Sequence, residues 1–305
     1  MTIREKELAG VAPGSDPPRR LPVLLAHLVE PFRRQPAPEP APATGFYTDT
    51  TVCIGCKACE VACKQWNQLP ADGFDWTGNS YDNTGTLSAT SWRQVKFIEQ
   101  LPSRGVPVLP GPESDGFDPA RWLMMSDVCK HCVTAPCQQA CPTGAIIHNE
   151  FDNVYIQPDI CNGCAYCIAA CPFGVITRAT IDGHAHKCTL CYDRQRDGLV
   201  PACAKACPTE SIQFGPIDEL RERARQRVEE LHRRGVAGAY LYGDEPGPSY
   251  SALNSFYLLV DRPSVYGLPE MPVNPWLAMK GDYLRVALSG VLSIAVLLAA
   301  LLGGR

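Results

Sequence analysis

The chain has 305 residues, 45% of them hydrophobic and 20% charged, a composition that is ordinary for a globular protein. This length allows two domains or one large one. The formal net charge of −4 excludes the strongly basic surface that marks nucleic-acid-binding proteins. Sixteen cysteines are many for a chain of this size, and their arrangement is the main signal in the sequence.

Residues 1–45 are rich in proline, which predicts a mostly extended arm. Arg19-Arg20 and the apolar run after it leave a twin-arginine export signal as the less favoured interpretation, because that run is short and interrupted. Further along, Thr51 and Val52 are expected to end a strand that leads into the first cysteine group.

The cysteines fall into four groups of four. The third group has the spacing C-x-x-C-x-x-C-x-x-x-C-P, which is the ligand run of bacterial ferredoxins. Its two-residue spacings let successive thiolates surround one cubic cluster, and Gly163 allows the backbone to turn tightly. In chain order the groups are Cys53, Cys56, Cys59 and Cys63; Cys129, Cys132, Cys137 and Cys141; Cys161, Cys164, Cys167 and Cys171; and Cys188, Cys191, Cys203 and Cys207.

Two other uses of cysteine are less favoured. Structural zinc also binds four cysteines, but usually from two separated C-x-x-C pairs. Disulfides are typical of small secreted domains, and three cysteines this close together cannot pair sensibly with one another. The spacing therefore favours four [4Fe-4S] clusters, for which sixteen thiolates are sufficient.

The fourth cysteine of a ferredoxin run ligates the other cluster in two-cluster proteins. Groups two and three are joined by a ferredoxin half-repeat and are expected to pair, which leaves groups one and four to pair around them. Cys207-Pro-Thr-Glu-Ser-Ile repeats the pattern of Cys141-Pro-Thr-Gly-Ala-Ile, in support of an internal repeat. Pairing of group one with two, and of three with four, is the less favoured alternative.

The favoured pairing predicts four ligand sets. They are cluster 1 on Cys53, Cys56, Cys59 and Cys207; cluster 2 on Cys188, Cys191, Cys203 and Cys63; cluster 3 on Cys129, Cys132, Cys137 and Cys171; and cluster 4 on Cys161, Cys164, Cys167 and Cys141.

This pairing predicts an α+β fold of two nested bacterial-ferredoxin-like modules. The outer module comprises residues 46–128 and 176–262, with an insertion at 64–128, and the inner module comprises 129–175. Three further elements are predicted in the outer module from their hydrophobic patterns: a strand at Ser91–Glu99, an amphipathic helix at Asp218–Arg234 and a strand at Phe256–Val260.

A connector at 263–282 leads to an apolar segment at 283–302, in which Arg285 is the one charged residue. The segment is long enough to cross a bilayer as a helix, and it has no polar face to present to water. A single C-terminal membrane anchor is therefore favoured over a buried core helix.

With these features placed, residues 46–302 resemble the beta (iron–sulfur) subunit of membrane-bound respiratory formate dehydrogenases. The four-cluster pattern is shared with electron-transfer subunits of other molybdenum or tungsten oxidoreductases. The stretches that favour the formate branch are Cys53-Ile-Gly-Cys56-Lys-Ala-Cys59, Tyr81-Asp-Asn, Leu87-Ser-Ala-Thr-Ser-Trp92, Lys187-Cys-Thr-Leu-Cys191-Tyr-Asp-Arg194, Pro201-Ala-Cys203 and Gly267-Leu-Pro. The proline-rich arm departs from the family pattern.

The resemblance implies a non-catalytic electron-transfer subunit. A separate alpha subunit with a molybdenum or tungsten bis-pterin centre would oxidise formate, and a cytochrome b gamma subunit would reduce quinone. It also implies a cluster domain on the extracytoplasmic face, whereas basic residues flanking the anchor weakly favour the cytoplasmic face. The alternatives are the same role in a complex acting on a sulfur compound, a nitrogen oxide or hydrogen, and, more remotely, a zinc-binding scaffold.

The sequence contains no nucleophile–base constellation and no phosphate-binding loop, in agreement with an electron carrier. Three lysines beside the cysteine groups are expected to offset cluster charge: Lys57, Lys130 and Lys187. Three histidines are interpreted as neighbours of the clusters or surface residues, because the thiolates already suffice as ligands: His131, His184 and His186.

Overall fold

The computed structural model describes residues 41–73, 81–100, 121–247 and 250–303, with the side chains of 276–282 and 302–303 excepted. The expected arm therefore lies almost entirely outside the described residues. Thr44 and Gly45, at its predicted end, instead begin a strand, β1 (Thr44–Asp49).

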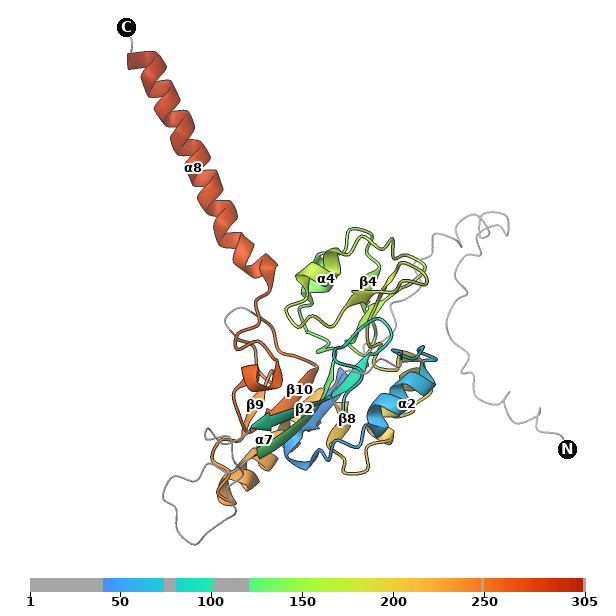
Figure 1. Ribbon diagram of the computed structural model, residues 1–305. Helices are drawn as coiled ribbons and strands as arrows, with labels where there is room; N and C mark the ends of the chain where they lie inside the picture. The colour runs from blue at the N-terminus through green and yellow to red at the C-terminus, as the bar shows by residue number, and fades with distance from the viewer. Residues whose placement is uncertain (1–40, 74–80, 101–120, 248–249, 304–305) are drawn as a thin grey trace, which may run out of the picture. The chain divides into compact units, whose positions relative to one another are not determined.

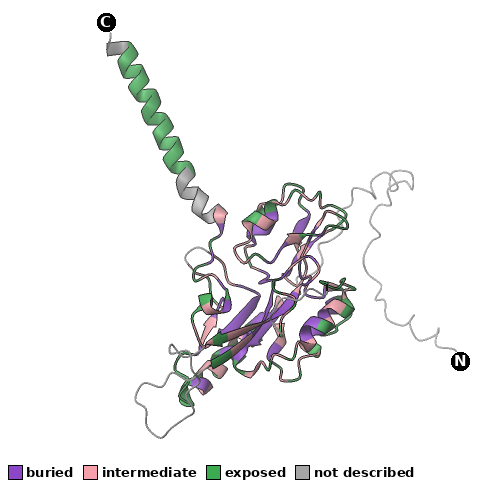
Figure 2. Cartoon of the chain, in the orientation of Figure 1, coloured by how far each residue is buried: buried purple, intermediate pink, exposed green. Residues whose placement is uncertain are grey.

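A four-stranded sheet forms the centre of the described chain, in the order β8 (Ile212–Pro216), β1, β10 (Ser255–Leu259) and β9 (Tyr240–Tyr242). β1 pairs parallel with β10 and antiparallel with β8. Figure 1 shows these strands side by side, and Figure 2 shows the sheet as a largely buried layer. The predicted strand at Phe256–Val260 is confirmed within one residue at each end.

Helix α7 (Ile217–Arg233) covers one face of this sheet, which confirms the predicted amphipathic helix. Its apolar positions recur at helical spacing, so Ile217, Leu220, Ala224 and Leu231 are all buried. They pack against Tyr47 and Phe256, whose rings stack with centroids 5.5 Å apart. The opposite face, represented by Phe46, packs into the larger core that contains the cysteines.

The strand predicted to end at Val52 ends earlier, at Asp49, and is followed by a 3₁₀ turn, η3 (Thr50–Val52). The Asp49 side chain accepts a hydrogen bond from the backbone N of Thr51 at 2.9 Å and so caps that turn. Asp49 also pairs with Arg227 of α7, with an N–O distance of 2.9 Å. The chain is thereby turned out of the sheet just before the first cysteine.

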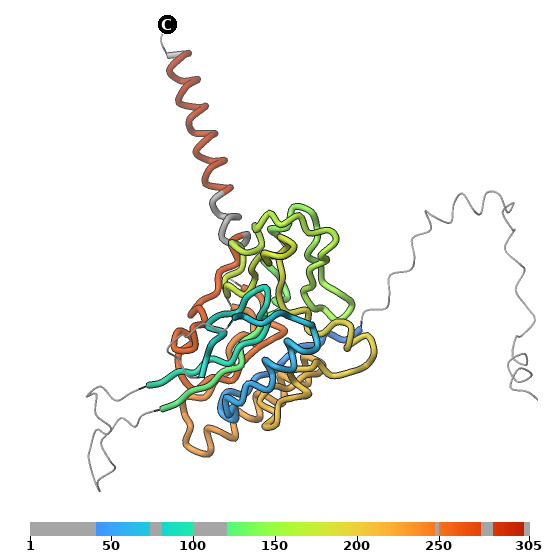
Figure 3. The backbone as a smooth tube through the Cα atoms, turned by 45° about the vertical axis from the view of Figure 1, so that its right-hand side comes forward, coloured from blue at the N-terminus to red at the C-terminus, as the bar shows by residue number. Residues whose placement is uncertain are grey.

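A long hairpin of β2 (Arg93–Gln100) and β3 (Arg121–Val128) leads into the second cysteine group. The two strands lie side by side in Figure 3. β2 confirms the predicted strand at Ser91–Glu99, shifted by one or two residues.

The cysteine groups lie in loops that alternate with short helices. Each group places one or two cysteines in a helix: α2 (Ala58–Trp66), α3 (Pro136–Gln139), α4 (Tyr166–Ala170) and α6 (Ala202–Lys205). A fifth short helix, α5 (Tyr192–Arg196), follows Cys191. Two small hairpins separate the groups: β4 (Ile146–His148) with β5 (Val154–Ile156), and β6 (Thr177–Arg178) with β7 (Ala185–His186).

After a 3₁₀ turn, η4 (Pro263–Tyr266), the chain enters α8 (Pro275–Gly303). The helix begins within the predicted connector, because proline is tolerated at the first position of a helix. Its segment Tyr283–Leu301 has a mean hydropathy of 2.3 and is exposed along its length, as Figure 2 shows. These properties fit a membrane anchor.

A buried ion cluster joins β2, β3, β10 and η4. Asp127 pairs with Lys130, which is fully buried, and with Lys96 at 2.9 Å. Tyr257 donates a hydrogen bond to the same carboxylate at 3.1 Å, and Lys96 also donates to the carbonyl of Tyr266 at 3.0 Å. Burial alone would raise the pKa of Asp127, but the two lysines outweigh it and hold the pKa well below its ordinary value.

Asp127→Asn is expected to destabilise the fold by about 3–5 kcal/mol, because it leaves the Lys130 ammonium buried without a counter-charge. The midpoint of guanidinium unfolding, followed by circular dichroism, measures the effect. Asp218→Asn is the matched control, since its pair with Arg221 is at 3.6 Å and the Asp218 side chain is exposed. Equal midpoints for the two variants would contradict the interpretation.

Gly45 sits where β1 passes against neighbouring backbone. A Cβ atom there would lie 1.8 Å from the carbonyl oxygen of Asn254 and 2.4 Å from Ile217 Cδ1. Gly45→Ala is therefore expected to cost about 1–3 kcal/mol through overpacking, seen as a lower midpoint of thermal unfolding. At Gly215, its partner on β8, an added Cβ would come no nearer than 4.0 Å to another residue, so Gly215→Ala should leave the midpoint nearly unchanged.

Candidate metal centres

All sixteen cysteines lie among the described residues, and all are free thiols. Two sets of four surround separate small cavities. Cys53, Cys56 and Cys59 line one cavity together with Cys207 from the last group. The other cavity is lined by Cys129, Cys132, Cys137 and, from the next group, Cys171. In both places the fourth thiol comes from a different group.

The remaining eight cysteines are neighbours in two further sets. Burial is the main cause that raises the pKa of Cys63. The neighbouring thiols of Cys188, Cys203 and Cys191 raise this pKa further. Burial raises the pKa of Cys167 to about 11, with additional contributions from its neighbours Cys161, Cys141 and Cys164. The thiols of each set thus lie close to one another, and their assignment as ligands of a common cluster stays a prediction.

Left-handed backbone conformations bend the ligand loops around their cavities. Gly55 and Lys57 have φ angles of 67° and 59°, and Gly163 and Ala165 have 70° and 67° at the corresponding positions of the third group. At Gly163 a Cβ atom would lie 2.3 Å from the carbonyl oxygen of Gly183. Glycine is therefore required there by both the backbone conformation and the close approach of a second loop.

The donor set fits iron–sulfur clusters better than a single ion. Within the described part of the chain, no three His, Cys, Asp or Glu side chains are close enough together to hold one metal ion. Zinc would require four sulfurs at about 2.3 Å from a common centre. The thiols instead line cavities, and four thiols around each cavity are the ligands that a four-iron cluster takes.

Burial keeps several of the unligated thiols protonated at neutral pH. It raises the pKa of Cys59 to about 11 and that of Cys137 to about 12. Only thiolates ligate iron, so metal binding at these sites must release protons. The proton release makes cluster binding favourable at higher pH and opposes it in acid.

The four sets follow one another in space. Cys59 of the first set is a close electrostatic neighbour of Cys203 in the second. Cys188 of the second set is a close electrostatic neighbour of Cys129 in the third set. Cys137 of the third set is likewise a neighbour of Cys167 in the fourth set. The two exposed cysteines are Cys56 and Cys164, one in the first set and one in the last.

The basic residues predicted beside the clusters have different surroundings. Lys57 faces carboxylates, with Asp82 at 3.3 Å and Glu60 at 3.5 Å. Lys130 and Lys187 are buried, and their charges lower the pKa values of the neighbouring thiols Cys132 and Cys137 against the effect of burial. The two buried lysines therefore meet the expectation that they offset negative charge at the cysteines.

The three histidines also differ. His131 is fully buried between two cysteines of the second group and has a φ of 43°. Neither of its ring nitrogens has a hydrogen-bond partner in the part of the chain that the structure describes. Burial, reinforced by Lys187, holds its pKa well below the ordinary value and keeps the ring neutral. His186 is half-buried and lies 2.7 Å from a carboxylate oxygen of Asp182, while His184 is also half-buried.

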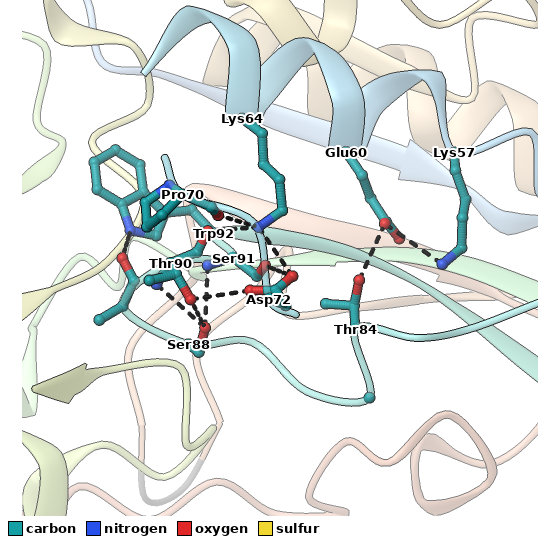
Figure 4. A network of polar contacts seen from close by, with 12 residues as sticks. Lys57, Glu60, Lys64, Pro70, Asp72, Thr84, Ser88, Thr90, Ser91 and Trp92 are labelled. Carbon is teal, nitrogen blue, oxygen red and sulfur yellow. Dashed lines mark hydrogen bonds and ion pairs between the residues drawn. The ribbon is translucent and has the colours of Figure 1, made fainter. Parts of the chain in front are cut away.

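A polar network holds α2 in place at the edge of the predicted insertion (Figure 4). Lys64, which stands where proline follows the other cysteine groups, donates to the carbonyls of Thr90 at 2.9 Å and Pro70 at 3.0 Å. It also pairs with Asp72 at 2.9 Å, and Asp72 accepts a hydrogen bond from Ser91. The described part of the insertion thus packs beside the helix that carries Cys59 and Cys63.

Two residues near the cysteines were missed in the sequence. Arg93 begins β2 and Ser126 lies on β3, and the Ser126 hydroxyl is 3.2 Å from the Cys59 sulfur. Neither residue lies in a cysteine loop, so spacing gave no signal for them. The one available indication was a positively charged residue within a predicted strand.

Comparison with known proteins agrees with the geometry. Two family models described as 4Fe-4S dicluster domains match residues 52–145 and 120–217. The formate dehydrogenase iron–sulfur subunit of Haemophilus influenzae is 38% identical over 252 residues, covering 80% of this chain and 75% of the relative. The formate dehydrogenase-O iron–sulfur subunit of Escherichia coli is 41% identical over 231 residues, covering 73% and 70%.

A related protein of another complex is more distant. A subunit of the anaerobic dimethyl sulfoxide reductase of Escherichia coli is 33% identical over 184 residues, covering 59% of this chain and 76% of the relative. Higher identity over a longer span favours the formate branch. The cysteine sets, the dicluster matches and these relatives together show that the chain belongs to the family of formate dehydrogenase iron–sulfur electron-transfer subunits.

Proposed function

We propose that the chain holds four [4Fe-4S] clusters and conducts electrons between a catalytic subunit and a membrane subunit of a formate dehydrogenase. A bound four-iron cluster accepts and releases one electron at a time. The ligand sets are those predicted from the sequence: Cys53, Cys56, Cys59 and Cys207; Cys188, Cys191, Cys203 and Cys63; Cys129, Cys132, Cys137 and Cys171; and Cys161, Cys164, Cys167 and Cys141. The observation that carries the proposal is that the thiols of each set are neighbours.

The proposal includes two nested ferredoxin-like modules. In the outer module, residues 46–128 and 176–262 supply the first and second sites. In the inner module, residues 129–175 supply the third and fourth. Support comes from the pairing of β1 with β8, which joins the two parts of the outer module, and from the hairpin of β4 and β5 within the inner module.

The order of the sites supports a direction of transfer. Cys56 and Cys164 are exposed at the two ends of the series, so partner subunits can approach there. Asn274, immediately before α8, donates a hydrogen bond to Gln139 of α3 at 3.1 Å, and α3 carries Cys137 of the third set. The third and fourth sites would therefore lie at the membrane end, with the first site receiving electrons from the catalytic subunit.

The partners are proposed from the relatives. They are an alpha subunit with a molybdenum or tungsten bis-pterin centre and a cytochrome b gamma subunit that reduces quinone. α8 would anchor the chain, with the cluster domain on the extracytoplasmic face. The second candidate is the same role in a complex of another oxidoreductase, which the dimethyl sulfoxide reductase relative favours at lower identity.

The native membrane complex tests this function. We expect about sixteen irons per chain, reducible clusters in low-temperature EPR spectra, and formate-dependent quinone reduction. The controls are the same complex without formate and with dimethyl sulfoxide offered as electron acceptor. Zinc in place of iron would overturn the cluster assignment, whereas full iron without formate oxidation would leave it intact and favour another oxidoreductase.

Cys171→Ser tests the crossed ligand sets. We expect it to damage the third cluster, because Cys171 lines the cavity of Cys129, Cys132 and Cys137, and to spare the cluster of its own run. EPR spectra and iron content of the variant complex measure the loss, with Cys164→Ser as the matched variant for the fourth cluster. The same signal lost in both variants would contradict crossed ligation.

A further inference from the structure

Arg93 places a buried positive charge between the first two cysteine sets. It is the first residue of β2 and has only 2% of its surface exposed. In the hairpin it stands opposite Val128, the residue immediately before Cys129. The guanidinium also lies over the ring of Phe46, 4.7 Å from the ring centroid. Its position is therefore fixed from several sides.

The guanidinium is only partly satisfied by hydrogen bonds. Nη1 donates to the Ser126 hydroxyl at 3.0 Å, and that hydroxyl is 3.2 Å from the sulfur of Cys59. Nε and Nη2 are buried, and no described residue forms a hydrogen bond with either of them. A buried charge with two unpaired donors is costly, so its surroundings must supply negative charge.

No carboxylate supplies that charge within the part of the chain that the structure describes. The ion pairs of the described residues include Lys130 with Asp127 but none for Arg93. The ionisable groups that interact most strongly with the Arg93 guanidinium are cysteines: Cys203 and Cys188 from the second set, and Cys59 from the first.

We propose that Arg93 is the counter-charge shared by the first and second cluster sites and that it raises the reduction potentials of these two sites. The proposal rests on the ligand sets of the proposed function. Reduction adds one negative charge to a site, and a fixed cation in a medium of low dielectric constant stabilises that charge. Arg93 would not touch the clusters. It would act on them through the thiolates and through Ser126, by holding a fixed positive charge beside these groups.

Arg93→Gln in the intact complex tests this role. Redox titration followed by EPR should show two of the four midpoint potentials lowered and two unchanged. The expected fall in the reduction equilibrium constant is at least tenfold, which is about 59 mV for a one-electron couple. Arg93→Lys, which keeps the charge, should recover most of the shift.

Lys205→Gln is the matched control, because Lys205 lies between Cys203 and Cys207 but is exposed to solvent. Removing its charge should leave all four potentials unchanged, since water screens exposed charges. Four unchanged potentials in Arg93→Gln at full iron content would overturn the proposal, as would an equal shift of all four.

Iron content separates the possible failures. If Arg93→Gln lost iron, Arg93→Met, which removes the charge but keeps the apolar bulk of the side chain, would decide the question: full iron with two lowered potentials supports the proposal, and full iron with four unchanged potentials overturns it. If the unmodified complex itself lacked four reducible clusters, the proposed function would fail first, independently of Arg93.

Discussion

The structure depends on bringing cysteines that are distant in the sequence around common cavities. Antiparallel strands achieve this twice in the same way. β1 ends just before Cys53 and β8 begins just after Cys207, and the pairing of Thr48 with Ile212 brings these ends together. β4 follows Cys141 and β5 precedes Cys161, and they pair through Ile146 and Ile156. The sheet register thus determines which thiols meet, and the loops supply only the local curvature.

Concentrating thiolates in a protein interior has an electrostatic consequence. Each buried thiolate needs a nearby positive charge or hydrogen-bond donor, because the interior cannot solvate it as water does. Lys130, Lys187 and Arg93 are buried among the cysteines, but their circumstances differ. Among the described residues, Lys130 pairs with the Asp127 carboxylate, whereas Lys187 and Arg93 have no carboxylate partner. Arg93 therefore supplies positive charge to the first two sets, and Lys187 supplies it to the third.

Local patterns in the sequence predicted what depends on local physics. The cysteine spacings identified the four groups, the helical period identified α7, and the apolar segment identified the core of α8. A strand before the first cysteine group was predicted, but the bounds of β1 were not, because five of its six residues are buried and give no alternating pattern. Arg93 and Ser126 were missed for a related reason: their importance arises from the pairing of β2 with β3, which brings them beside cysteines of other loops. Tertiary pairing leaves no signature in local spacing.

The uneven exposure of the cysteines is consistent with a carrier that must both protect and deliver electrons. Most cysteines of the second and third sets are buried, and the half-buried Cys132 and Cys171 line a small cavity, where water and adventitious oxidants have little access. At the ends, Cys56 and Cys164 reach the surface, where a partner subunit would cover them on assembly. Exposed apolar side chains, such as that of Ile54, lie in the same two loops. Apolar side chains beside an exposed cysteine favour a contact with a partner from which water is excluded. Such a contact would keep the terminal sites in the same low-dielectric surroundings as the interior sites.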